Sequence, residues 1–428
     1  MTDHGQGVRA ALSATRPLAD VFAAAGYRLY LVGGIIRDDR AGRSRPDSAD
    51  YDLTTDARPD RIKDLVSPLA DAVWSLGERF GTIGCSLGGQ DYEITTHRAD
   101  TYEPDSRKPV VAFGDNVHDD LARRDFTINA MAVDLADERL VDPFDGAADL
   151  AAGVLRTPLD PAISFSDDPL RMARAARFLA TLNLTPDPAL VEAVVSMAGR
   201  MRIVSVERVR EELSKMMALT DPQPGFAFLS STGLLAELLP AVAAAGLDHE
   251  LVGRRVALVN AAGSSGDRVA ARWAALLLDA DADRRRPELQ RLKPSSELEQ
   301  SVRWLVDAAS WLAVGAVPTD RPTLRRVAAS APKGMTVEQR LEFVAALRSG
   351  ADLAEAAATL TELRATEPDL DAPRPPLTGL EVAQQLGVEP GPVIGEAHAW
   401  LLAHRFEHGP MSASEAQALL DRWWSERS

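Results

Sequence analysis

Cysteine and long hydrophobic runs are what this 428-residue sequence most lacks. Cys85 is its single cysteine, and one thiol cannot build an intramolecular disulfide framework or a cysteine-rich zinc site. Because reduced thiols are typical of the cytoplasm, we expect a cytoplasmic protein. No apolar run approaches the ~20 residues of a membrane-spanning helix. Residues 1–20 are polar and lack the apolar core and cleavage site of a signal peptide, so we expect no membrane contact.

Positive charge is also scarce. The chain has 63 acidic and 47 basic residues and a formal net charge of −16, whereas nucleic-acid-binding proteins are more usually basic. This balance counts mildly against an RNA ligand. It does not exclude one, because binding depends on where arginine and lysine cluster, and a carboxylate metal site adds negative formal charge that bound cations offset.

The chain is too long for one compact core, so two to four domains of ~100 to 200 residues are expected. From residue 29 to about residue 142, short apolar runs alternate with helical or loop segments, which is the rhythm of a mixed sheet with helices. Beyond residue 168, alanine, leucine, arginine and glutamate recur at helical spacing. The pattern predicts a small catalytic head followed by a long helical body.

The segment LVGGIIRDD, residues 31–39, takes an apolar strand into a pair of glycines and a helix that carries Arg37. Gly33 and Gly34 leave backbone N–H groups accessible, so a phosphate could approach them, and Arg37 would add a charged fork. The alternative is an ordinary tight turn between a strand and a helix.

The segment DYDLTT places Asp50 and Asp52 two positions apart in a predicted strand. Alternation puts both carboxylates on one face, where they repel each other unless a cation lies between them. The pair therefore suggests Mg²⁺ ligation by hard oxygen ligands. Glu93 in DYEITTHR, on a strand that could pair beside the first, is the candidate third carboxylate. Alternatively, the two aspartates only solvate an edge strand.

These two clusters, in this order, resemble the polymerase-beta-like nucleotidyltransferases. Four further segments are similar to those of the class II CCA-adding enzymes and their relatives, the bacterial poly(A) polymerases. They are RRDFTINAMAVD at 123–134, VDPFDG at 141–146, SFSDDPLRMARAARF at 164–178 and SVERVREEL at 205–213. The fourth family motif usually begins with Glu-Asp, and this chain has Asp167-Asp168 there.

The resemblance implies an α+β head with a small mixed or antiparallel sheet, followed by an all-α neck, body and tail. The breaks in the sequence favour a nucleotidyltransferase head at 1–155, a nucleotide-selecting neck at 156–222, a body at 223–368 and a tRNA-binding tail at 369–428. The substrates would be CTP, ATP and the 3′ end of a tRNA held by its acceptor and T-arm. No protein partner is expected.

The resemblance also implies roles for the matched residues. Catalysis would fall to Asp50, Asp52 and Glu93, with Mg²⁺ held by Asp50 and Asp52. Nucleotide binding would involve Gly33, Gly34, Arg37, Arg124, Asp168, Arg171, Arg174 and Arg177. Between the head strands and Arg123, a loop with Tyr102, Arg107, Lys108 and Pro109 is similar to the family loop needed for adding the final A, which favours complete CCA addition.

The side chains of Asp168 and Arg171 suggest how a base could be chosen without a template. Asp168 before Pro169 suits a helix N-cap with proline at the first helical position, so Arg171 would lie one turn along and face the same pocket. A carboxylate accepts hydrogen bonds and a guanidinium donates them. Cytosine and adenine both offer an amino donor beside a ring-nitrogen acceptor, whereas uracil and guanine present a carbonyl in place of that amino group and an N–H in place of that acceptor. Arg177 would drift off this face and reach a phosphate or support the neck.

Near the C-terminus, residues 375–409 resemble the family tail. A helix ending at Gly387 and a tight turn at Pro390-Gly391-Pro392 before another helix are expected, and Trp423 and Trp424 should fill a core seam. The scattered histidines predict no second, hydrolytic activity. The alternatives are a poly(A) polymerase, an A-only or CC-only enzyme, an antibiotic nucleotidyltransferase and a non-catalytic RNA-binding protein.

Overall fold

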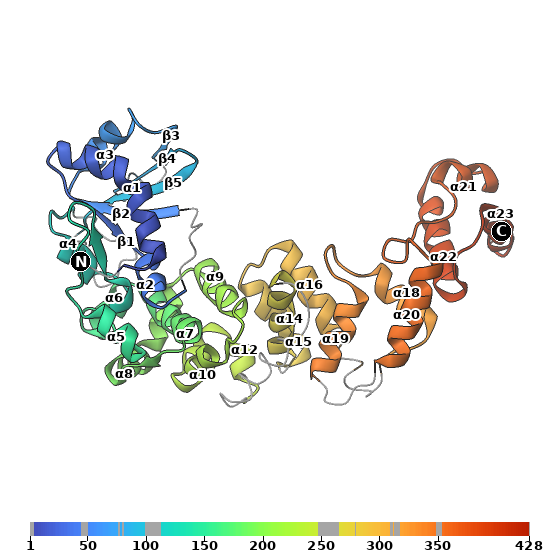
Figure 1. Ribbon diagram of the computed structural model, residues 1–428. Helices are drawn as coiled ribbons and strands as arrows, with labels where there is room; N and C mark the ends of the chain where they lie inside the picture. The colour runs from blue at the N-terminus through green and yellow to red at the C-terminus, as the bar shows by residue number, and fades with distance from the viewer. Residues whose placement is uncertain are drawn as a thin grey trace. The chain divides into compact units, whose positions relative to one another are not determined.

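We describe the protein from a computed structural model of the whole chain (Figure 1). The structure describes residues 4–43, 50–75, 81–98, 113–246, 265–278, 280–308, 317–347 and 353–427, together with the single residues 78 and 311. Contacts divide the chain into two compact units, Met1–Pro240 and Ala241–Ser428. The finer division into head, neck, body and tail stays a prediction.

A seven-stranded mixed sheet forms the centre of the N-terminal part of the first unit, as the sequence predicted. Its strand order is β3-β4-β5-β2-β1-β6-β7, and only β2 and β5 run parallel to each other. The strands are β1 (Leu29–Val32), β2 (Asp50–Thr55), β3 (Ala72–Trp74), β4 (Thr82–Leu87), β5 (Gln90–Thr96), β6 (Ala132–Asp134) and β7 (Leu140–Val141).

Five helices accompany this sheet among the described residues: α1 (Gln6–Ala24), α2 (Gly34–Arg40), α3 (Pro59–Val66), α4 (Val117–Ala122) and α5 (Gly146–Ala152). Helix α1 buries residues at spacings of three and four, including Val8, Leu18 and Phe22, so one apolar stripe faces the sheet. These side chains share a core with Leu31 and Leu53 on the central strands. The core fixes the strands from which the candidate site is built.

Helices complete the first unit after the sheet. They are α6 (Pro161–Asp167), α7 (Leu170–Leu182), α8 (Pro188–Met197), α9 (Val206–Met217), α10 (Gln223–Ser231) and α11 (Leu234–Leu238), with the short strands β8 (Val154–Leu155) and β9 (Thr185–Pro186) pairing in parallel. Helix α7 packs against α9 and α10. Gly225 on α10 permits this approach, since a Cβ there would lie 2.6 Å from the Ala176 carbonyl oxygen.

The second unit is helical throughout its described part. Its helices include α14 (Ser265–Leu277), α15 (Ala282–Arg291), α16 (Ser296–Val306), α18 (Arg321–Ala329), α19 (Val337–Leu347), α20 (Ala354–Thr366), α21 (Gly379–Leu386), α22 (Pro392–His408) and α23 (Ala413–Ser425). The short helix α12 (Pro240–Ala243) lies where the two units meet in sequence. None of the described helices has the length and apolar character to cross a bilayer.

The last three helices form a small core, as the sequence predicted. Gly387 ends α21 in the left-handed conformation, and α22 begins at Pro392 after the turn. Trp423 is buried in this core and Trp424 packs against it. Helices α21 and α23 each start with a capping box, in which a serine or threonine and a glutamate satisfy backbone groups reciprocally.

A buried ion pair connects α18 with the end of α20. Arg325 contacts Glu367 at 2.8 Å, and the two side chains are only 8% and 3% exposed. Arg325 Nη1 also donates to the carbonyl oxygen of Phe406 near the end of α22 at 3.2 Å. One guanidinium therefore holds three segments of the second unit together.

We predict that Arg325→Met lowers the free energy of unfolding of the second unit by ~3 to 5 kcal/mol, because Glu367 would remain buried without its cation. Thermal or urea unfolding followed by circular dichroism measures this. The control is Arg326→Met, whose pair with Glu407 is half exposed and should cost only ~0 to 1 kcal/mol. Equal losses in the two variants would show that the buried pair does not hold this joint.

Candidate active site

The turn at Gly33 and Gly34 joins β1 to α2 beside the acidic strand β2. Gly33 has a φ of 88°, a left-handed conformation that residues with a Cβ rarely adopt. A Cβ at Gly33 would also lie 2.8 Å from Asp52 Oδ2, well inside normal contact. Glycine is therefore required here both by the backbone and by the neighbouring carboxylate.

The acidic residues follow the alternation that the sequence predicted. Asp50 and Asp52 are exposed on β2, whereas Tyr51 between them is buried, so both carboxylates lie on one face of the sheet. Strand β5 pairs with β2 in parallel and places Glu93 directly beside Asp52. The expectation that Glu93 lies on a strand neighbouring the aspartates is confirmed.

The concentration of negative charge perturbs these groups. Loss of hydration raises the pKa of Asp52, and Asp50 raises it further, while Arg124 opposes the shift. Loss of hydration likewise raises the pKa of Glu93, with added repulsion from Asp52 and Asp50. A cation between these groups would relieve the repulsion, and their oxygen atoms suit a hard divalent ion.

In the parts of the chain that the structure describes, no three carboxylate, imidazole or thiol groups lie close enough together to form a metal site. The donor chemistry and the shared face of Asp50 and Asp52 fit a divalent cation. Ligation of Mg²⁺ by these two residues stays a prediction.

A cavity of about 380 Å³ opens between the glycine turn and helix α7. Five arginines and three aspartates line it, although the chain as a whole is strongly acidic. The lining consists of Gly33, Gly34, Arg37, Asp52, Arg123, Arg124, Asp125, Asn129, Asp168, Arg171, Arg174 and Phe178. The cavity therefore brings together seven of the predicted nucleotide-binding residues and Asp52, which is predicted to be catalytic. Asp50, Glu93 and Arg177 are not among the residues that line it.

Arg124 reaches this cavity from the segment that follows α4. Its Nη2 lies 3.3 Å from Asp120, and its Nη1 donates to the carbonyl oxygen of Asn129 at 3.4 Å. Its buried Nε–H has no hydrogen-bond partner among the residues that the structure describes. Asp120 is itself buried, yet its pKa is lowered, because Arg124 and Arg123 outweigh the effect of desolvation. The guanidinium is thus held at the cavity wall through both of its terminal nitrogen atoms.

Asp168 precedes helix α7, but the expected capping arrangement needs a correction. The helix begins at Leu170 with Pro169 as its N-cap residue, one position later than predicted. The Asp168 carboxylate still accepts the Leu170 N–H at 3.1 Å. It also pairs with Arg208 of α9 at 2.8 Å, a partner that the sequence did not indicate.

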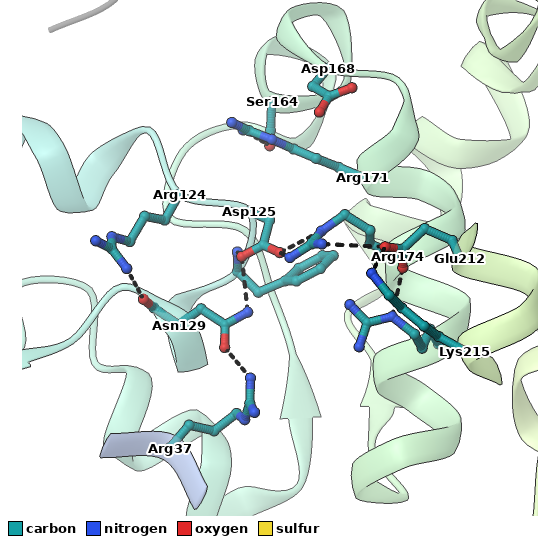
Figure 2. A network of polar contacts seen from close by, with 12 residues as sticks. Arg37, Arg124, Asp125, Asn129, Ser164, Asp168, Arg171, Arg174, Glu212 and Lys215 are labelled. Carbon is teal, nitrogen blue, oxygen red and sulfur yellow. Dashed lines mark hydrogen bonds and ion pairs between the residues drawn. The ribbon is translucent and has the colours of Figure 1, made fainter. Parts of the chain in front are cut away.

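Arg171 lies on the same helix and is almost fully buried. Its Nη1 donates to Ser164 Oγ at 2.8 Å, and its Nη2 donates to the carbonyl oxygen of Arg123 at 2.5 Å. Figure 2 shows the guanidinium lying across the top of the site toward Ser164, with Asp168 above it. Both residues line the cavity, as predicted, and the backbone N–H of Arg171 donates to the Asp168 carbonyl oxygen at 3.0 Å.

Arg174 and Arg177 continue along α7. Arg174 pairs with Asp125 at 2.6 Å and lies 3.5 Å from Glu212 of α9. Arg177 donates to Glu212 at 2.6 Å and so holds α7 against α9, in agreement with the support role considered for it. Its predicted contact with the nucleotide stays a prediction.

Comparison of the chain with known proteins shows which family it resembles. A family model described as the poly A polymerase head domain matches residues 29–156. A second, described as a probable RNA and SrmB-binding site of polymerase A, matches residues 183–245. A CCA-adding enzyme of Lactobacillus delbrueckii subsp. bulgaricus is 33% identical over 300 residues, which cover 70% of this chain and 72% of that protein. The chain belongs to the CCA-adding enzyme family. Membership implies nucleotidyl transfer and the use of a divalent metal.

Other relatives agree with this assignment over different lengths. The CCA-adding enzyme of Levilactobacillus brevis is 40% identical over 220 residues, and the match covers 51% of this chain and only 53% of that relative. Among solved structures, the Bacillus stearothermophilus CCA-adding enzyme in complex with CTP matches with a TM-score of 0.75 and 26% identity over 98% of both chains. The Thermotoga maritima CCA-adding enzyme complexed with tRNA, at 21% identity and a TM-score of 0.61 over 95% of this chain and 94% of that one, supports the fold alone.

Several site residues were missed from the sequence of this family member, among them Arg123 and Phe178, which line the cavity. Asp125 and Asn129 lie in the segment RRDFTINAMAVD, of which only Arg124 was a predicted site residue, and Glu212 lies in SVERVREEL. An acid directly after two arginines was a usable signal for Asp125. Nothing local marked Asn129. The predicted loop residues Tyr102, Arg107, Lys108 and Pro109 lie outside the described residues.

We predict that Asp52→Asn raises the free energy of unfolding of the metal-free protein at neutral pH by ~0.5 to 1 kcal/mol. The effect is small because solvent screens the charge of Asp52. The pKa of Asp52 is raised in the folded state, so its ionised form opposes folding. The gain should therefore grow as pH rises through the folded pKa of Asp52, and vanish below the ordinary pKa of an aspartate.

Thermal unfolding in EDTA across pH 3 to 8 measures this gain. Adding Mg²⁺ should then stabilise the wild type and leave Asp52→Asn unchanged. Asp64→Asn, at an exposed ion pair on α3, is the control. It should change the stability at neutral pH by less than ~0.5 kcal/mol and should still be stabilised by Mg²⁺ like the wild type. Destabilisation by Asp52→Asn at neutral pH would contradict the assignment of strained, like-charged carboxylates.

Proposed function

We propose that the protein adds C, C and A in turn to the 3′ end of tRNA, taking the nucleotides from CTP and ATP and releasing pyrophosphate. The observation that carries this proposal is one cavity whose wall combines Gly33, Arg37 and Asp52 with Asp168 and Arg171. The first three suit a triphosphate beside a catalytic carboxylate, and the last two suit the edge of a base. The relatives named as CCA-adding enzymes support the same activity.

Arg37 is arranged to hold the triphosphate. Its Nε donates to Asp38 at 2.8 Å, and its Nη1 donates to Asn129 at 2.7 Å. An incoming phosphate can displace the partly exposed Asp38 from one edge of the guanidinium, because a fork of N–H groups binds two phosphate oxygens at once. Arg124 adds a second donor on the same wall.

Asp50 and Asp52 would hold Mg²⁺, and the bound ion would activate the attacking hydroxyl and neutralise the leaving pyrophosphate. Glu93 has a raised pKa and lies beside Asp52, so one of its carboxylate oxygens is suited to accept the proton of the RNA 3′ hydroxyl. Attack on the α-phosphate then follows from the fixed positions of the triphosphate and the RNA end.

Asp168 and Arg171 retain the capacity to read a base beyond their observed contacts. A carboxylate accepts up to about four hydrogen bonds, and a guanidinium donates five. Asp168 accepts from Leu170 and Arg208, and Arg171 donates to Ser164 and to the carbonyl of Arg123. The remaining acceptor on Asp168 suits an amino group, and the remaining donors on Arg171 suit a ring nitrogen, a combination that cytosine and adenine share.

The tRNA would be held through its backbone and shape, because the deep groove of an RNA duplex is poorly readable. The helical second unit, and within it the tail at 369–428, would bind the acceptor and T-arm.

The single cysteine, Cys85, is buried and its pKa is raised to about 11. A single cysteine cannot form an intramolecular disulfide, which fits the reducing cytoplasm that we propose as the location.

Incubating the protein with a tRNA transcript that lacks its CCA end, and with CTP and ATP singly and together, tests the function directly. We predict two C residues with CTP alone and one further A when ATP is present. Growth of a longer A tail would show a poly(A) polymerase instead.

Asp52→Ala should abolish incorporation and leave tRNA affinity within about twofold, since binding and chemistry use different residues. Retention of a tenth of the activity by this variant would contradict the catalytic assignment.

We further predict that Asp168→Ala and Arg171→Lys each reduce the discrimination of CTP against UTP by roughly 5- to 150-fold. Each variant removes one hydrogen bond whose loss costs ~1 to 3 kcal/mol. Single-nucleotide incorporation with each NTP measures the ratio of kcat/KM values. Arg202→Ala is the matched control, because its ion pair with Glu237 is exposed and Arg202 does not line the cavity. Unchanged selectivity in both Asp168→Ala and Arg171→Lys would exclude this pair as the base reader.

A further inference from the structure

A chain of hydrogen bonds connects the phosphate-binding arginine with the base-reading helix (Figure 2). Arg37 Nη1 donates to Asn129 Oδ1 at 2.7 Å. Asn129 Nδ2 donates to Asp125 Oδ1 at 2.9 Å. The other oxygen of Asp125 accepts from Arg174 Nε at 2.9 Å and from Nη2 at 2.6 Å. The chain thus passes from α2, through the short helix η2 (Thr127–Asn129), to α7.

The amide of Asn129 has the chemistry that this position demands. One end must accept from a guanidinium, and the other must donate to a carboxylate. An asparagine side chain does both and adds no charge. Asn129 and Asp125 are each less than a tenth exposed, so neither end of the amide can readily be satisfied by solvent.

The carboxylate of Asp125 stays ionised in this buried position. Desolvation acts to raise its pKa, but Arg174 and the hydrogen bond from Asn129 outweigh that effect, and the pKa is lowered. Asp125 therefore ties Arg174 in place with a full charge. Phe178 fills the space between the two arginines, with its ring centroid 5.2 Å from the Cζ of Arg37 and 5.6 Å from that of Arg174.

We infer that Asn129 is a positioning residue that couples phosphate binding to base selection, an inference that rests on the proposed function. Arg171 lies one helical turn before Arg174 on α7, so whatever fixes Arg174 also fixes the base-reading face. When a triphosphate replaces Asp38 on Arg37, the Nη1 of Arg37 remains on Asn129. The position of the phosphates thereby determines where α7 presents Asp168 and Arg171. Selectivity for the base then depends on a correctly placed triphosphate.

The first test is a double-mutant cycle on base discrimination. Asn129→Ala should lower the CTP-to-UTP ratio of kcat/KM by about 5- to 30-fold, because buried partners lose a hydrogen bond. Arg174→Ala should lower the ratio in the wild-type background and change it less than twofold in the Asn129→Ala background. Asn129→Asp keeps the size of the side chain but cannot donate to Asp125, so it should be at least as harmful as alanine.

Asn116→Ala is the matched control. Asn116 caps α4 through its side chain, so its loss should lower stability and leave the discrimination ratio unchanged. If Asn129→Ala loses stability in the same way with its ratio unchanged, Asn129 only supports η2 and the coupling is absent. Independent, multiplying effects of Asn129→Ala and Arg174→Ala would overturn the inference equally.

A second measurement needs neither RNA nor chemistry. Calorimetric titration of the whole protein with inorganic triphosphate gives the affinity of the phosphate site alone. We expect Arg174→Ala to weaken this affinity about fivefold or more when Asn129 is present and by less than twofold when Asn129 is replaced by alanine. Equal effects in both backgrounds, or no effect in either, would refute the coupling. If the wild type fails to extend tRNA, the proposed function fails, and this binding cycle still decides the role of Asn129.

Discussion

The buried carboxylate of Asp125 allows several arginines to converge on one cavity. Like charges gathered in a partly desolvated pocket repel each other, and burying a cation without a partner is costly. Asp125 pairs with Arg174 and is itself held ionised by Arg174 and Asn129. Glu212 of α9 likewise forms ion pairs with Arg174 and Arg177. The positive surface offered to a nucleotide therefore depends on acids placed behind it, and an acidic chain can still bind a polyanion.

On the sheet, by contrast, negatively charged groups are gathered together. Asp50, Asp52 and Glu93 share one face of two parallel strands, and their mutual repulsion together with lost hydration raises the pKa of Asp52 and of Glu93. Such an arrangement is unfavourable for folding without a cation. Carboxylates with perturbed pKa values are typical of functional sites, in line with the catalytic role proposed for them. The arginines at the cavity thus have acidic partners behind them, whereas the acids on the sheet repel one another.

Local patterns explain which parts of the site could be predicted from the sequence. The alternation in DYDLTT, the glycine pair after an apolar strand and the order of the motifs depend on neighbouring residues, and the structure agrees with each. The contacts of Asn129 with Arg37 and of Arg174 with Asp125 join residues 92 and 49 positions apart. No local periodicity marks such pairs. The start of α7 at Leu170 shows the same limit, because the Asp168 side chain is shared between the helix end and Arg208.

A crystal structure of the protein with CTP and a divalent cation tests the central claim most directly. The account predicts the triphosphate against the Gly33 turn and Arg37, with the cytosine amino group about 2.7 to 3.2 Å from the Asp168 carboxylate and its ring acceptors at a similar distance from Arg171. The contacts of Arg37 with Asn129 and of Arg174 with Asp125 should persist. A cytosine bound away from α7, with Asp168 contacting only Arg208 and Leu170, would contradict it.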